Sequence, residues 1–99
     1  MVTLDALKAQ LLELKPKLQK EYSITQLGIF GSYARGEQTD NSDIDILVEF
    51  APDISFGLVT FCNLENQLSE LLGARVDLVM KDALKHHIGE QVLQEVVYL

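Results

Sequence analysis

Residues 43–50 restrict the fold of this 99-residue chain more than any other segment, because apolar and acidic side chains alternate along them. The apolar positions are Ile44, Ile46, Val48 and Phe50, and the positions between them are Asp43, Asp45, Leu47 and Glu49. A two-residue period is typical of a β-strand, whose successive side chains point to opposite faces of a sheet. The alternation therefore predicts a strand with one face in the core and carboxylates on the other.

Two carboxylates on one face of this strand indicate a site for divalent cations. Asp43 and Asp45 would lie about 6.5–7 Å apart at the backbone, and such like charges raise each other's pKa unless a cation lies between them. Such a pair can share two metal ions about 3.5–4 Å apart, the arrangement used for in-line nucleotidyl displacement. Mg²⁺ retains waters and substrate phosphates as ligands, so few protein carboxylates suffice. Asp77, on another predicted strand, is oriented to complete the site.

A glycine-bounded segment lies just before this strand in the sequence. Residues 31–36, Gly-Ser-Tyr-Ala-Arg-Gly, predict a turn or a single helical turn. A glycine at the end of a strand lets backbone amides approach an anion closely, and a helical turn that opens at Ser32 would favour a phosphate at its free N–H groups. Gly31 and Ser32 together predict a cradle for a triphosphate beside the metal pair.

The N-terminal part of the chain predicts a helix followed by a strand. Leucines at three- and four-residue steps predict an amphipathic helix with Thr3 as its N-cap. Pro16 removes a backbone donor inside this pattern, which predicts either a kink or a second short helix that begins there. The apolar, partly β-branched segment Ser23–Phe30 predicts the first strand of the sheet.

The C-terminal part predicts two helices with a strand between them. Helical spacing of apolar residues extends from about Ser55 to Leu72, ahead of a left-handed cap at Gly73. Arg75–Met80 predicts the third strand, and Asp82 to about Glu95 predicts the last helix. The terminal segment 96–99 either continues this helix or adds a short edge strand. The fold class is therefore α+β, with a small mixed sheet and flanking helices in a single domain over residues 1–99.

The charge of the chain excludes one class of partner. Its net charge is −7, and residues 37–99 hold 12 acidic and 3 basic side chains. Binding to a nucleic-acid backbone depends on basic residues that displace counterions from phosphates. We therefore expect no direct binding to a long nucleic acid.

Other sequence features set expectations for location and cysteine chemistry. The longest apolar run is four residues, far below the roughly 20 that a membrane-spanning helix needs. No secretory signal is visible at the N-terminus, so a cytoplasmic location is expected. Cys62 is the single cysteine, which excludes an internal disulfide, and it is expected to pack in the core as a small apolar residue.

Three segments of the chain resemble a known enzyme superfamily. They are residues 28–37, Gly-Ile-Phe-Gly-Ser-Tyr-Ala-Arg-Gly-Glu, residues 42–50, Ser-Asp-Ile-Asp-Ile-Leu-Val-Glu-Phe, and residues 76–79, Val-Asp-Leu-Val. Gly-Ser, ten residues, Asp-x-Asp and a later strand aspartate are similar to the pattern of the DNA polymerase beta-like nucleotidyltransferases. The strings resemble its smallest members, the minimal nucleotidyltransferases, over nearly the whole chain.

This resemblance implies a specific reaction. Similar members act as MntA-type antitoxins beside a HEPN ribonuclease toxin, which they silence by transferring AMP from ATP to a tyrosine hydroxyl. By that likeness, Gly31 and Ser32 would hold the β and γ phosphates, and Asp43 and Asp45 would bind two Mg²⁺ ions. Asp77 would bind the catalytic metal near the attacking hydroxyl. Arg35 is assigned to nucleotide binding, either by contacting phosphate or by bracing the turn.

Two other functions stay open at this point. The chain could be a non-catalytic binding module that neutralises its partner by covering it, with a vestigial or nucleotide-sensing metal site. It could also adenylylate a small molecule, although enzymes of that kind need a second domain for the acceptor. Loss of transfer with binding retained in Asp43→Ala would separate the enzyme from the binding module.

Overall fold

The computed structural model describes residues 3–52, 57–83 and 90–99. Its elements alternate between helices and strands, as the sequence predicted. They are α1 (Leu4–Tyr22), β1 (Ile24–Phe30), α2 (Ser32–Arg35), β2 (Ile44–Phe50), α3 (Leu58–Leu72), β3 (Val76–Met80), α5 (Glu90–Glu95) and β4 (Val97–Tyr98).

The four strands form one mixed sheet in the order β3-β2-β1-β4. The central pair, β1 and β2, is antiparallel, and β4 is antiparallel to β1. β3 is parallel to β2, because α3 returns the chain to the same end of the sheet before β3 begins. The predicted α+β class with a small mixed sheet is confirmed.

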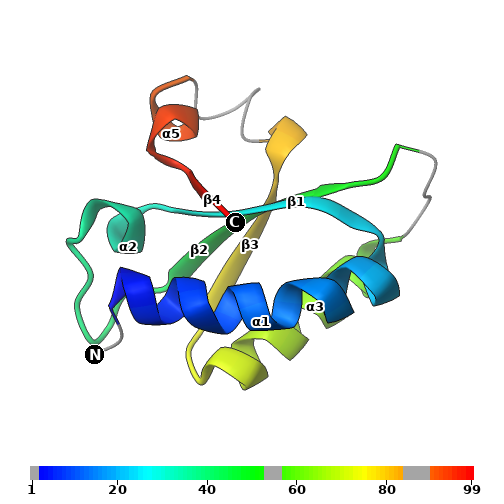
Figure 1. Ribbon diagram of the computed structural model, residues 1–99, viewed down its shortest axis with the longest axis horizontal. Coiled ribbons are helices and arrows are strands. Elements are labelled where there is room, and N and C mark those ends of the chain that lie inside the picture. The colour runs from blue at the N-terminus through cyan, green and yellow to red at the C-terminus, as the bar shows by residue number, and fades with distance from the viewer. Residues whose placement is uncertain (1–2, 53–56, 84–89) are drawn as a thin grey trace.

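The helices lie on both faces of this sheet (Figure 1). α1 and α3 cover one face, and buried leucines of both helices, such as Leu11 and Leu68, pack with Ile44, Ile46 and Val48 of β2. These strand residues are at most 1% exposed, so the predicted inward face of β2 is confirmed.

The opposite face of β2 is not wholly solvent-exposed. Leu47 is fully buried there in a cluster with Phe30, and Val92, Leu93 and Val96, from α5 and the residue after it, pack against this cluster. α5 thus covers part of this face of the sheet. Period-two alternation did not reveal this second, smaller apolar cluster.

One helix, α1, spans the whole predicted N-terminal helical region. Thr3 caps it, because its Oγ1 accepts a hydrogen bond from the Ala6 N–H at 3.2 Å. The prediction of a second helix that begins at Pro16 is wrong, since Pro16 lies inside α1 on its exposed side. Leu12, whose carbonyl loses its intrahelical partner there, is 50% exposed, so water can replace the missing bond.

The C-terminal predictions have mixed outcomes. Residues 81–83 and 90–95 are helical, and the rest of the predicted helix Asp82–Glu95 lies outside the described residues. The edge-strand alternative for the terminal segment is confirmed by β4, and Gly73 has the predicted left-handed conformation, with φ 67°.

Two further observations concern the surface. Cys62 is exposed, so its predicted place in the core is wrong. It is two residues before the buried Leu64 on α3, and a helix turns such neighbours to different faces. In the described part of the chain, no helix has the length and apolar character needed to cross a membrane.

Candidate active site

Gly31 joins β1 to the single helical turn α2, as the sequence predicted. Its φ of 74° and ψ of −150° lie in a region that is essentially restricted to glycine. A Cβ atom at this position would lie 2.0 Å from Asp45 Oδ2 and 2.9 Å from its Cγ. The absence of a side chain at Gly31 therefore lets the turn lie directly against the Asp45 carboxylate.

The two later aspartates are neighbours across the parallel strands. Asp45 on β2 pairs with Asp77 on β3, and Phe30, the residue before Gly31, pairs with Asp45 on its other side. Asp77 is exposed and Asp45 is partly buried. The register thus places Phe30, Asp45 and Asp77 in one row across the sheet, and Gly31 directly follows Phe30.

Asp43 lies at the entrance to β2, on the same face as Asp45 by alternation. One of its carboxylate oxygens is 4.0 Å from Nε of Arg75, and the two side chains are 45% and 83% exposed. So exposed a pair is weak, which leaves the Asp43 carboxylate available for another partner.

Burial, with the charges of Asp77 and then Asp43, raises the pKa of Asp45 to about 6. Arg35 opposes this change with its positive charge. All three aspartates therefore share one electrostatic environment, although they come from different parts of the chain. A negative cluster of this kind is stabilised by a cation.

The donor set fits Mg²⁺ in kind, because carboxylate oxygens are its preferred protein ligands. In the described residues, no three His, Cys, Asp or Glu side chains are arranged to hold a metal ion together. The adjacent pair Asp45 and Asp77 would therefore hold an ion with waters and substrate phosphates as the remaining ligands, which is the usual arrangement for Mg²⁺. The assignment of Asp43, Asp45 and Asp77 as metal ligands stays a prediction.

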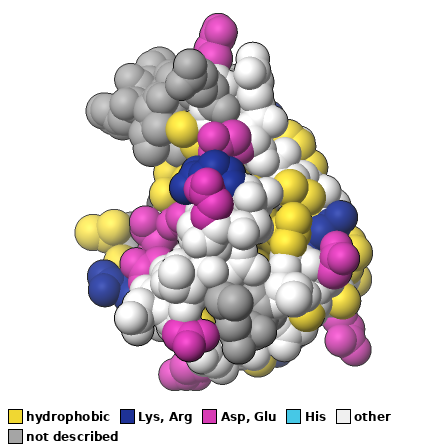
Figure 2. All heavy atoms as spheres, turned by 90° about the vertical axis from the view of Figure 1, so that its left-hand side faces the viewer, with side chains coloured by type: hydrophobic (Ala, Val, Ile, Leu, Met, Phe, Trp, Pro, Cys, Tyr) yellow, Lys and Arg dark blue, Asp and Glu magenta, His cyan; other side chains and the backbone are white. Residues whose placement is uncertain are grey.

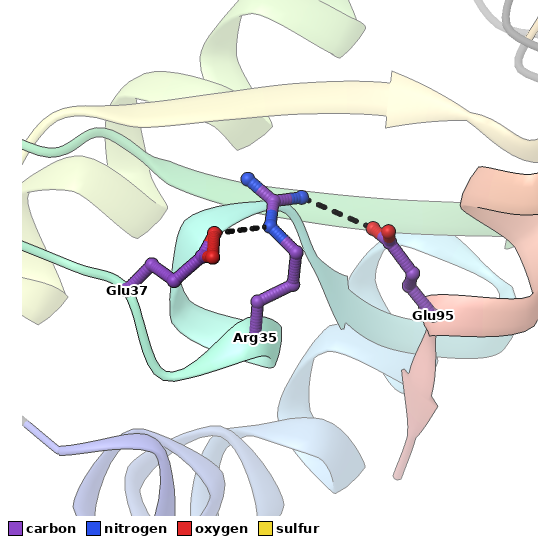
Figure 3. A network of polar contacts seen from close by, with 3 residues as sticks. All are labelled: Arg35, Glu37 and Glu95. Carbon is purple, nitrogen blue, oxygen red and sulfur yellow. Dashed lines mark hydrogen bonds and ion pairs between the residues drawn. The ribbon is translucent and has the colours of Figure 1, made fainter.

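Arg35, the last residue of α2, lies between two glutamates (Figure 3). Its Nε donates to Glu37 Oε1 at 2.8 Å, and its Nη1 donates to Glu95 Oε2 at 3.1 Å. These bonds, with that to Glu37 first, raise the pKa of Arg35. The guanidinium is thus fixed next to the glycine-serine turn by a residue from the far end of the chain.

The same side of the molecule presents many acidic side chains (Figure 2). This view looks from the side where α2 lies in Figure 1, and the Asp and Glu side chains gather around a basic side chain near its centre. Such a surface attracts cations and disfavours an unaccompanied polyanion.

Of the predicted site residues, the structure brings Gly31 against Asp45 and pairs Asp45 with Asp77, while Asp43 and Arg35 lie close enough to affect the pKa of Asp45. Ser32 begins α2, and its carbonyl accepts the Glu37 N–H at 2.9 Å, which closes the turn. Sequence reasoning missed Glu95 altogether, because nothing in the sequence indicates a contact across 60 residues.

The chain is similar in sequence to known nucleotidyltransferases. The sequence model for the nucleotidyltransferase domain matches residues 11–99. The chain is 46% identical to "Protein adenylyltransferase MntA" of Thermococcus cleftensis over 99 residues, which cover 100% of this chain and 98% of that protein.

Solved structures are also similar. A structure described as a minimal nucleotidyltransferase has a TM-score of 0.79 and 34% identity, covering 99% of this chain and 97% of the other. A toxin–antitoxin crystal structure with AMP-PNP has a TM-score of 0.70 and 28% identity, covering 87% of this chain and 69% of the other. These matches confirm both the resemblance to minimal nucleotidyltransferases and the fold that it implied. The chain therefore belongs to the nucleotidyltransferase domain family and is a nucleotidyltransferase.

Proposed function

We propose that this nucleotidyltransferase transfers AMP from ATP to a tyrosine hydroxyl of a partner toxin, a HEPN ribonuclease, and so acts as an antitoxin. The relative named as a protein adenylyltransferase matches over the full length of this chain, and a similar solved structure is a toxin–antitoxin assembly with AMP-PNP. Both support a protein acceptor and an adenine nucleotide.

One observation carries the chemical part of the proposal, namely the contact of the Gly31 turn with Asp45 next to Asp77. A Cβ at Gly31 would lie 2.0 Å from Asp45 Oδ2, so a triphosphate at the turn would lie beside the carboxylates. Nucleotidyl transfer needs such an arrangement, because the phosphates and the charge that compensates them must lie side by side.

The proposed reaction is an in-line displacement at the α-phosphorus. The tyrosine Oη forms a bond to the α-phosphorus while the bond from that atom to the β-phosphate oxygen breaks, and pyrophosphate leaves. The phenolic proton passes to a carboxylate of the site, and Asp77 is the exposed candidate. When bound at Asp43, Asp45 and Asp77, Mg²⁺ ions would polarise the phosphates and stabilise the leaving group.

The chain's own residues divide the remaining tasks. Gly31 and Ser32 bind the β and γ phosphates, and Arg35, fixed by Glu37 and Glu95, contributes positive charge beside them. The acceptor tyrosine must come from the partner.

The test is a transfer assay with intact-mass detection. The chain is incubated with ATP, Mg²⁺ and the toxin encoded beside it, and we expect the toxin to gain one or more AMP groups. Asp43→Ala should abolish this gain, whereas Glu70→Ala, on the exposed side of α3, should leave it unchanged. Neutralisation of the toxin by Asp43→Ala at wild-type strength would instead identify a binding module.

A further inference from the structure

The outer edge of β3 is closed by side chains of α3. Val76 and Leu78 point their N–H groups away from β2, because Arg75 and Asp77 alternate with them and the Arg75 carbonyl accepts from Ile44 of β2 at 2.9 Å. Ser69 Oγ accepts the N–H of Val76 at 3.0 Å, and Glu65 Oε2 accepts the N–H of Leu78 at 2.9 Å. We refer to these two bonds as the β3 edge contacts.

The β3 edge contacts lie on both sides of Asp77. β3 is an edge strand, so β2 fixes it from one side only. On the other side, the amides directly before and after Asp77 are held by α3. Asp77 itself faces the site and pairs with Asp45.

Ser69 and Glu65 are also tied to each other. The Ser69 hydroxyl donates to the Glu65 carbonyl at 2.9 Å, which directs its lone pairs toward Val76. Both side chains are partly buried, so water competes less for these bonds than at the surface. These bonds attach residues 76–78 to α3, whereas on an open edge the same segment would be held by β2 alone.

We propose that Glu65 and Ser69 are positioning residues, which hold the β3 backbone so that the Asp77 carboxylate stays beside Asp45. The inference rests on the proposed function in that it assigns Asp77 to the reacting site. Neither residue touches the nucleotide or the acceptor, and their effect passes through the backbone of residues 76–78.

We expect the effect of Glu65 on Asp77 to depend on its hydrogen bond with the Leu78 N–H and not on its charge. Glu65→Gln keeps an oxygen that can accept the Leu78 N–H, whereas Glu65→Leu has a similar size and no acceptor. Glu70→Leu is the matched control, because it makes the same change on the exposed side of the same helix. Ser69→Ala removes the second contact with a smaller change in volume.

Three readouts are measured on the full chain. They are hydrogen exchange of the Val76 and Leu78 amides, kcat and KM for ATP in the transfer assay, and the affinity for Mn²⁺ in the presence of AMP-PNP. We expect Glu65→Leu to lose protection at Leu78 and to lower kcat by roughly tenfold or more, since a misplacement of about 1 Å can cost about 100-fold. KM for ATP should change less than about twofold, because Gly31 and Ser32 hold the phosphates.

The controls separate the outcomes. Glu65→Gln should keep kcat, Mn²⁺ affinity and Leu78 protection within about twofold of wild type, as should Glu70→Leu. Wild-type kcat and Mn²⁺ affinity in a Glu65→Leu protein that has lost Leu78 protection would overturn the inference. Equal loss in Glu65→Gln and Glu65→Leu would also overturn it, because charge would then be the cause.

Three further results remain decisive. If Glu65→Leu does not fold, Ser69→Ala is judged by the same criteria at Val76. If the wild-type chain transfers nothing to the toxin, the proposed function fails. The inference is then decided by whether Glu65→Leu binds Mn²⁺ more weakly than the wild-type chain does. A wild-type chain that neither transfers AMP nor binds Mn²⁺ overturns both.

Discussion

Glu95 at the end of α5 accepts a hydrogen bond from Arg35 at the end of α2, across 60 residues of sequence. After Val96, the chain enters β4 and pairs with Gly28 and Ile29 of β1. The C-terminal segment is therefore attached to the glycine-serine turn both through β1 and through the Arg35 side chain.

Removal of this contact should weaken nucleotide binding more than it weakens the fold. We expect Glu95→Ala to raise KM for ATP by roughly two- to fivefold at unchanged kcat, because an exposed ion pair orients the Arg35 side chain but contributes little to the stability of the fold. Steady-state kinetics at several ATP concentrations measure this. Glu90→Ala, which removes an exposed carboxylate from the same helix, is the control. A lower KM in Glu95→Ala would mean that Glu95 competes with phosphate for Arg35.

Gly31 and Gly36 provide a matched pair of glycine substitutions. Both have positive φ, 74° and 73°, but a Cβ at Gly31 would collide with Asp45, whereas nothing lies within 4 Å of one at Gly36. We expect Gly36→Ala to cost about 1–2 kcal/mol of stability from backbone strain alone. Gly31→Ala should cost more and should abolish transfer. Urea unfolding at pH 7 and the transfer assay measure both effects, and equal behaviour of the two variants would contradict the close contact at Gly31.

These two glycines also illustrate how far the sequence was informative. Gly31 could be identified from the sequence because it lies a fixed number of residues before Asp43 and Asp45. The alternation of residues 43–50 that marks these aspartates is itself a local pattern. The order of the strands and the partner of Arg35 depend on contacts between distant segments, which local periodicity does not contain. Leu47 is an example, since its burial results from α5, more than 40 residues later. At Pro16 the sequence predicted too much, since a second helix does not begin there. The neighbouring turn is exposed, so the helix tolerates the missing hydrogen bond.

Asp45 should make the fold less stable as the pH rises. Its pKa is about 6 in the folded chain and 3.8 without these surroundings, so the folded chain binds the proton more tightly than the unfolded chain does. The associated stability is complete below about pH 4 and is lost as the pH rises through 6. Asp45→Asn removes this penalty, and we expect it to be about 1–2 kcal/mol more stable than wild type at pH 7.5, after allowance for partial solvent exposure.

Urea unfolding in the presence of a chelator measures the Asp45 effect. The difference between wild type and Asp45→Asn should disappear near pH 4 and grow between pH 4 and about pH 6 to 7, following the ionisation of Asp45. Glu70→Gln provides a control in which an exposed carboxylate is removed from α3. A difference that does not depend on pH would show that packing, and not ionisation, distinguishes the two side chains.

Mg²⁺ with AMP-PNP should stabilise the fold because both bind only to the assembled site. At 100 times the dissociation constant, a ligand adds about 2.7 kcal/mol to the free energy of unfolding, which corresponds to roughly 10 °C or more in Tm for a domain of this size. Differential scanning fluorimetry with each ligand alone and with both together measures the shift. Asp43→Asn should reduce the shift, since the proposed metal site loses a charge while the Gly31 turn stays intact.

The combined shift should exceed the sum of the two separate shifts, because the nucleotide phosphates complete the coordination that two adjacent carboxylates, Asp45 and Asp77, begin. Strictly additive shifts would mean that the metal and the nucleotide occupy separate places on the molecule.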